Sequence, residues 1–181
     1  MNTHDSPDTS LTPSTAACEI ARLSRDARFD GVFFTAVLTT RIYCRPVCPA
    51  RAPKAENVVY YASAAAAQAQ GFRPCLRCRP ELAPGNLLWL HGEHLVTRAL
   101  TLINEGFLAE HSLEALAERL SVGARQLRRL FVKYLGAPPV AVHATQRLLF
   151  AKQLLTETAL SITDVALASG FGSVRRFNSA F

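Results

Sequence analysis

The chain has 181 residues, of which 49% are apolar and 19% are charged, so its composition excludes a disordered protein and allows one or two small domains. Its 20 Lys and Arg against 14 Asp and Glu give a formal net charge of +6, which favours an anionic partner without specifying one. The sequence contains no apolar run long enough to span a membrane and no secretory signal, so we expect a cytoplasmic protein without a membrane partner.

The first half of the chain predicts a short tail followed by a small α+β domain. Residues 1–17 are rich in Ser, Thr and Pro and have few apolar side chains, so we expect a flexible tail there. The β-branched and aromatic runs that follow are typical of strands, and the alanine-rich run is typical of a helix. The expected elements are a helix over 16–25, a strand over 32–40, a strand over 57–63 and a helix that Ser63 caps and that stops at Gly71.

Four of the five cysteines stand in two close pairs, Cys44-x3-Cys48 and Cys75-x2-Cys78. In a reducing compartment this pattern predicts a tetrahedral site for one zinc ion rather than a pair of disulfides. The fifth cysteine, Cys18, is interpreted as a small buried apolar residue. Spacing alone favours a purely structural zinc site, although zinc-bound thiolates are also nucleophiles.

From residue 80 onward the pattern becomes helical. Residues 80–86 contain two prolines and a glycine and are predicted to form a linker. Beyond it, one apolar helix face is marked by Val96, Leu100, Ile103 and Phe107. Three further helices are expected, over 113–120 behind the capping residue Ser112, over 124–135, and over about 140–156.

Residues 161–181 repeat the pattern of residues 112–131. Ser161 corresponds to Ser112 and Val165 to Leu116, and each segment has a small-residue turn before a basic helix. Two helix-turn-helix units joined by a long helix explain this better than a plain helical bundle. We therefore predict an α+β zinc domain over 18–85 and an all-α DNA-binding domain over 86–181.

Basic residues are concentrated in two places that suit nucleic acid. The second helix of each repeat carries donors that can reach bases and phosphates, whereas the alternative is a merely solvated helix face. These residues are Arg125, Gln126, Arg128 and Arg129 in the first repeat and Ser173, Arg175 and Arg176 in the second. Around the cysteines, residues 41–79 contain seven Lys and Arg, including Arg45, against one acid, and these arginines could hold phosphates close to the sulfurs.

The segment TTRIYCRPVCPARAPKAENVVYYASAAAAQAQGFRPCLRCRPE resembles the zinc domain of the bacterial Ada adaptive-response proteins, over roughly residues 19–85. Residues 90–181 resemble the AraC-type DNA-binding domain that follows it in that family. The resemblance implies single-turnover repair, in which a methyl group passes irreversibly from a DNA methylphosphotriester to zinc-bound Cys44. It also implies that Cys48, Cys75 and Cys78 are the other zinc ligands. Methylated protein would then bind double-stranded promoter DNA and activate repair genes through RNA polymerase.

Thr40, Arg51 and Arg73 match positions that contact DNA in the family, whereas Pro49 stands where its best-known member has another such arginine. The chain ends at Phe181, inside the second recognition helix, so we expect a truncated second unit. The sequence TDVALASGFGSVRRFN in this repeat resembles that of family members fused to an AlkA-type glycosylase, a domain that would lie beyond Phe181.

Two other functions remain open from the sequence. One is a pure AraC-type regulator whose zinc site is structural or senses thiol-reactive agents. The other is a repair protein that has lost specific promoter recognition. Cys44 separates the first alternative from repair, because methyl transfer requires this residue to carry the product.

Overall fold

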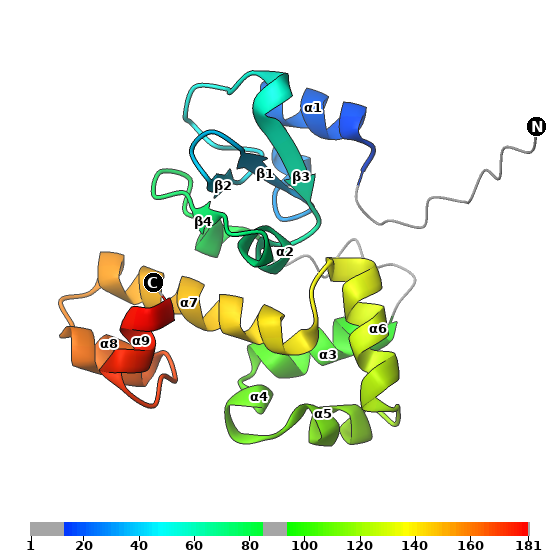
Figure 1. The fold of residues 1–181 in the computed structure, drawn as a ribbon, viewed down its shortest axis with the longest axis vertical. Helices are drawn as coiled ribbons and strands as arrows, with labels where there is room; N and C mark the ends of the chain where they lie inside the picture. Colours follow the sequence, from blue (N-terminus) through cyan, green and yellow to red (C-terminus); the bar gives the residue numbers. More distant parts are fainter. Residues whose placement is uncertain (1–12, 85–93, 181) are drawn as a thin grey trace, which may run out of the picture.

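A computed structural model describes residues 13–84 and 94–180, which form a small α+β domain followed by an all-helical domain (Figure 1). Within these ranges no helix is both long and apolar enough to cross a lipid bilayer. The first domain consists of α1 (Thr15–Ser24), η1 (Ala27–Phe29), β1 (Phe34–Val37), β2 (Ile42–Cys44), η2 (Ala55–Asn57), β3 (Val58–Tyr61), α2 (Ala64–Ala69), β4 (Arg73–Pro74) and η3 (Pro80–Leu82). Most of the expected tail, residues 1–12, lies outside the described residues.

The sheet has the strand order β3-β1-β2-β4. β1 pairs antiparallel with both β2 and β3, and β2 pairs parallel with β4. The strand expected over 32–40 is shorter in the structure, where β1 covers only Phe34–Val37. The chain turns after Val37, and Arg41 adopts a positive φ of 56° before β2 begins. Neither β2 nor β4 was expected from the sequence, which predicted loops around both cysteine pairs.

The alanine-rich helix α2 covers one part of this sheet. Ser63 caps it, since its side-chain oxygen accepts a hydrogen bond from the backbone N–H of Ala66 at 3.0 Å. Small alanine side chains let α2 approach the strands closely. The resulting core contains Phe34, Ala36, Tyr43, Ala64, Ala67 and Phe72.

The helical domain contains two helix-turn-helix units, as the sequence repeat predicts. Its helices are α3 (His94–Asn104), α4 (Phe107–Glu110), α5 (Leu113–Arg119), α6 (Ala124–Leu135), α7 (Pro139–Glu157), α8 (Ile162–Ala168) and α9 (Val174–Ala180). Ser112 and Ser161 cap α5 and α8 in the same way, each accepting a backbone N–H at 3.2 Å. Corresponding residues of the two units also fill corresponding core positions, because Leu127 of α6 and Phe177 of α9 are both buried.

One expected helix is divided. Phe107 does not continue the helix face of Val96, Leu100 and Ile103, because α3 ends at Asn104 and Phe107 begins α4. Gly106 separates the two helices with a φ of 89°, a left-handed conformation that glycine adopts without steric cost and that cannot continue a right-handed helix.

Helix α7 joins the two helix-turn-helix units and also supports the first domain, crossing the molecule beneath α2 (Figure 1). The Thr145 hydroxyl of α7 donates a hydrogen bond to Gln68 Oε1 of α2 at 2.8 Å. Further along α7, the Lys152 ammonium pairs with the Glu81 carboxylate, and both side chains are buried, at 7% and 1% exposure. Residues 80–82 are therefore a fixed contact between the domains rather than part of a free linker, and residues 85–86 lie outside the described ranges.

Candidate metal centre and the cleft beside it

The four paired cysteines form one cluster. The Sγ atoms of Cys44, Cys48, Cys75 and Cys78 all lie within 4.8 Å of one another. The short β2–β4 pair brings the two cysteine loops together, because Cys44 ends β2 and Cys75 follows β4. The backbone N–H of Cys75 donates to the Tyr43 carbonyl at 3.0 Å, which continues this pairing up to the sulfurs.

This cluster fits a single zinc ion. Sulfurs placed at about 2.3 Å around a tetrahedral ion lie about 3.8 Å apart, within the spread of the four Sγ atoms. Without a cation the thiols cannot all ionise. Hydrogen bonds from Cys44 and Cys78 lower the pKa of the Cys48 thiol to about 2, whereas hydrogen bonding to Cys48 raises the pKa of Cys44 far above its usual value. A divalent cation supplies the positive charge that four adjacent thiolates need.

Cys18 lies apart from this cluster in α1. It is fully buried with Ala21, Val32 and Phe33, and burial raises the pKa of its thiol to about 11. The sequence interpretation of Cys18 as a small buried apolar residue is therefore confirmed.

The four sulfurs differ in their surroundings. Cys75 and Cys78 are buried, whereas Cys44 and Cys48 are partly exposed. Cys78 Sγ accepts a hydrogen bond from the backbone N–H of Arg45 at 3.3 Å, and Cys48 accepts one from the backbone of Ala50, which contributes to its low pKa. Each such bond withdraws electron density from the sulfur that accepts it. The dominant neighbours of Cys44 are instead the side chains of Cys48 and Cys78.

Arg45 has an internal partner. Its guanidinium forms an ion pair with the carboxylate of Asp30, with side-chain exposures of 16% and 7%, and also donates to the Cys78 carbonyl at 3.1 Å. The hydrogen bond to the Asp30 carboxylate raises the pKa of Arg45 further, so its guanidinium stays charged. This placement favours a role in holding the cysteine loops rather than in contacting DNA.

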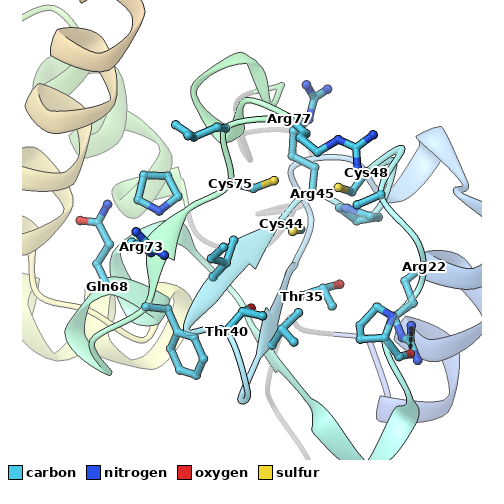
Figure 2. Close-up of a pocket in the computed structure, with 18 of the residues that line it drawn as sticks. Arg22, Thr35, Thr40, Cys44, Arg45, Cys48, Gln68, Arg73, Cys75 and Arg77 are labelled. Carbon is cyan, nitrogen blue, oxygen red and sulfur yellow. Dashed lines mark hydrogen bonds between the residues drawn. The ribbon is translucent and has the colours of Figure 1, made fainter.

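A cleft of about 1130 Å³ opens beside the cluster, and the side chains of Cys44, Cys48 and Cys75 line it (Figure 2). Among the described residues its lining includes seven cationic side chains and no Asp or Glu. Thr40, Arg51 and Arg73, which the resemblance singled out, are exposed and line this cleft. Arg77, one of the basic residues that the sequence places around the cysteines, lines it as well, and so does Arg25, which sequence reasoning did not select. Arg25 was missed because it lies outside the cysteine segment, 19 residues before Cys44 in the chain.

The residues predicted on the second helix of each repeat are all exposed. Arg125, Gln126, Arg128 and Arg129 lie on α6, while Arg175 and Arg176 lie on α9. Two of the predicted residues have local partners. Arg128 forms an exposed ion pair with Glu114 at 3.1 Å, and the Ser173 hydroxyl accepts the backbone N–H of Arg176 at 3.3 Å, so Ser173 also serves as a cap for α9.

Two family models match the chain. The metal binding domain of Ada matches residues 17–81, and a helix-turn-helix domain matches residues 116–181. The solved structure described as the methylated N-Ada/DNA complex is 38% identical, with a TM-score of 0.39, over 75% of this chain and 98% of that one.

Three curated relatives span both domains. The probable bifunctional transcriptional activator/DNA repair enzyme AlkA of Mycobacterium tuberculosis is 47% identical over 89% of this chain. The bifunctional transcriptional activator/DNA repair enzyme Ada of Escherichia coli is 39% identical over 82% of it, and AdaA of Bacillus subtilis is 32% identical over 89% of it. The chain spans about a third (32%) of the Mycobacterium protein and 40% of the Escherichia protein, but 74% of the Bacillus protein. With both domains matched and most of the Bacillus relative covered, the chain belongs to the Ada family.

Proposed function

We propose that this chain repairs alkylated DNA by moving a methyl group from a methylphosphotriester in the DNA backbone onto Cys44. The observation that supports this most directly is the position of a partly exposed cysteine of the metal cluster in a cleft lined by cations and, among the described residues, by no acid. The relatives named as DNA repair enzymes support the same conclusion.

In this proposal the exposed arginines of the cleft bind the damaged DNA backbone. Arg51 and Arg73 line it, and none of the ion pairs of the described residues involves either of them. Guanidinium groups form paired hydrogen bonds with phosphate oxygens, so these two residues can hold the phosphates flanking the neutral triester. The Thr40 hydroxyl, exposed at the same rim, can donate to a phosphate oxygen.

The chemical step transfers one methyl group without an added acid or base. A zinc ion held by the four cysteines would keep them as thiolates at neutral pH. Cys44 Sγ forms a bond to the methyl carbon with its lone pair, while the bond between that carbon and the phosphate oxygen breaks. The electron pair leaves with the oxygen and restores an anionic phosphodiester, which the neighbouring arginines stabilise. The thioether on Cys44 has no route back to a thiolate, so each chain acts once.

Two features favour Cys44 over its companions as the acceptor. It is partly exposed and lines the cleft, whereas Cys78 is buried and absent from the cleft lining. Among the described residues its main neighbours are side chains, whereas backbone N–H groups donate to Cys78 and Cys48 and weaken those two sulfurs as nucleophiles. Cys75 lines the cleft but is buried.

Repair is proposed to switch on DNA-dependent regulation. Four thiolates and one zinc ion carry a net charge of −2, and methylation of one sulfur reduces it to −1. A less negative cluster is repelled less by the DNA backbone, so the methylated protein binds promoter DNA more tightly through its helix-turn-helix units. Recruitment of RNA polymerase by the DNA-bound protein belongs to the same proposal.

The experiment that tests this function uses zinc-loaded protein and duplex DNA with a radiolabelled methylphosphotriester. Label should move to the protein until each chain carries one methyl group and then stop. Duplex DNA labelled only on guanine N7 is the control and should donate nothing. Zinc-loaded protein that takes no methyl from the phosphotriester would identify the site as structural or thiol-sensing instead.

A further inference from the structure

The cleft beside the cysteines has a second wall that comes from the helical domain. Its lining includes four residues of α7 and one of α9, namely Leu148, Lys152, Leu155, Thr156 and Ala180. Figure 2 shows Gln68 and Arg73 on the side of the cleft that lies toward α7. Its volume of about 1130 Å³ exceeds the roughly 300–1,000 Å³ of a small-molecule site, so the cleft has room for a segment of polymer.

None of the described residues that α7 contributes to the cleft lining is acidic. Its nearest acid, Glu157, is held by Arg79 at 2.6 Å and does not line the cleft. The carboxylate of Glu81 is buried against Lys152 and Arg79. The α7 side chains in the lining are therefore apolar or hydroxyl-bearing, apart from Lys152, whose charge is balanced by Glu81, so this wall does not repel an anionic chain.

The position of this wall is fixed by contacts on both sides of the cluster. Tyr43, the residue before Cys44, accepts a hydrogen bond from Gln68 at 3.1 Å, and Gln68 accepts one from Thr145 of α7. Glu81, three residues after Cys78, forms the buried ion pair with Lys152 of α7. Breaking a buried ion pair leaves an uncompensated charge, so the distance between α7 and the cysteine loops is well determined.

We propose that α7 is the second wall of the substrate site, so that the DNA strand presenting its methylphosphotriester to Cys44 runs between the cysteine loops and α7, past Leu155. This inference rests on the proposed function for the reaction and extends it to the helical domain. It makes α7 a part of substrate binding as well as the connection between the two helix-turn-helix units.

Leu155 and Phe150 provide a matched test. Both are large exposed apolar residues of α7, at 42% and 47% exposure, but only Leu155 lines the cleft. Leu155→Glu should slow methyl transfer from a methylphosphotriester duplex about threefold or more at low salt, because it places a negative charge beside the strand. Leu155→Lys should slow transfer less than Leu155→Glu does, because its added charge attracts the strand instead of repelling it. Phe150→Glu and Phe150→Lys should both match the wild type, with zinc content confirmed for every variant.

A second measurement on unmodified duplex DNA does not depend on the reaction. Leu155→Lys should steepen the slope of log affinity against log salt by about 0.9, the effect of one added phosphate contact, and Phe150→Lys should leave the slope unchanged. Equal slopes for both lysine variants, or equal slowing by Leu155→Glu and Leu155→Lys, would overturn the inference while methyl transfer by the wild type stood. If no protein transfers a methyl group but the two lysine variants still differ in slope, the proposed reaction is wrong and the cleft is still a DNA-binding site.

Discussion

Thr35 lies directly opposite Cys44 in the β1–β2 pair and lines the same cleft. Its hydroxyl oxygen is buried and finds no hydrogen-bond partner among the described residues. A buried polar atom left unpaired costs about 1–3 kcal/mol of folding free energy. We therefore expect Thr35→Val to raise the free energy of unfolding by about 1 kcal/mol, measured by urea titration of zinc-loaded protein.

The same substitution also tests whether the Thr35 hydroxyl takes part in methyl transfer. Methyl transfer by Thr35→Val should proceed at the wild-type rate, because the hydroxyl is buried and is not needed to hold or move a proton in the proposed step. Transfer that slows without loss of zinc would show that this hydroxyl acts on Cys44 or its substrate.

At the scale of elements, the serine caps are the most direct consequence of the sequence repeat. Ser161 accepts the backbone N–H of Asp164, and its hydroxyl also donates to the Asp164 carboxylate at 2.6 Å. Ser161→Ala should lower the free energy of unfolding of the second unit by about 1 kcal/mol, since the cap satisfies an otherwise unpaired helical N–H.

Hydrogen exchange followed by mass spectrometry can locate that effect. Faster exchange in α8 and α9 with unchanged exchange in α5 and α6 is the expected result, and Ser112→Ala should give the reciprocal pattern. Uniform acceleration across both units would contradict two separately capped helix-turn-helix units.

Much of the architecture followed from local sequence signals. Cap residues, apolar spacing and the internal repeat identified most of the helices, and cysteine spacing predicted the cluster of four sulfurs that fits a zinc ion. β2 and β4 were missed because their pairing is long-range, and because β4 has only two residues next to a cysteine loop with a proline. The buried role of Glu81 could not be predicted either, since it depends on Lys152, 71 residues away in the chain.

At the scale of the whole molecule, the two domains should respond differently to loss of zinc. The core that joins α2 to the sheet is small, whereas the first helix-turn-helix unit has a much larger cluster of buried residues around Leu116 and Phe131. A chelator should therefore abolish exchange protection in β1 and β3 and leave α5 and α6 protected. Retained protection of β1 and β3 in zinc-free protein would contradict a metal-dependent fold.

The change in cluster charge also predicts how methylation acts at a distance. At a separation of about 7 Å and an effective dielectric constant near 20, removing one negative charge of the cluster lowers its repulsion with a phosphate by roughly 2 kcal/mol before salt screens it. Methylated protein should bind nonspecific duplex about tenfold or more tightly than unmethylated protein at low salt. The ratio should shrink as salt increases, and equal affinities at low salt would reject the charge switch.

The most direct test is a peptide map of zinc-loaded protein after reaction with DNA carrying methylphosphotriesters, read by mass spectrometry. The methyl group should be found on Cys44 and on no other cysteine. Cys44→Ser should take up none if it retains zinc, and Cys18→Ser should match the wild type, because Cys18 is buried away from the cluster. A methyl group on Cys48, Cys75 or Cys78 in the wild type would contradict the assignment of Cys44 as the acceptor.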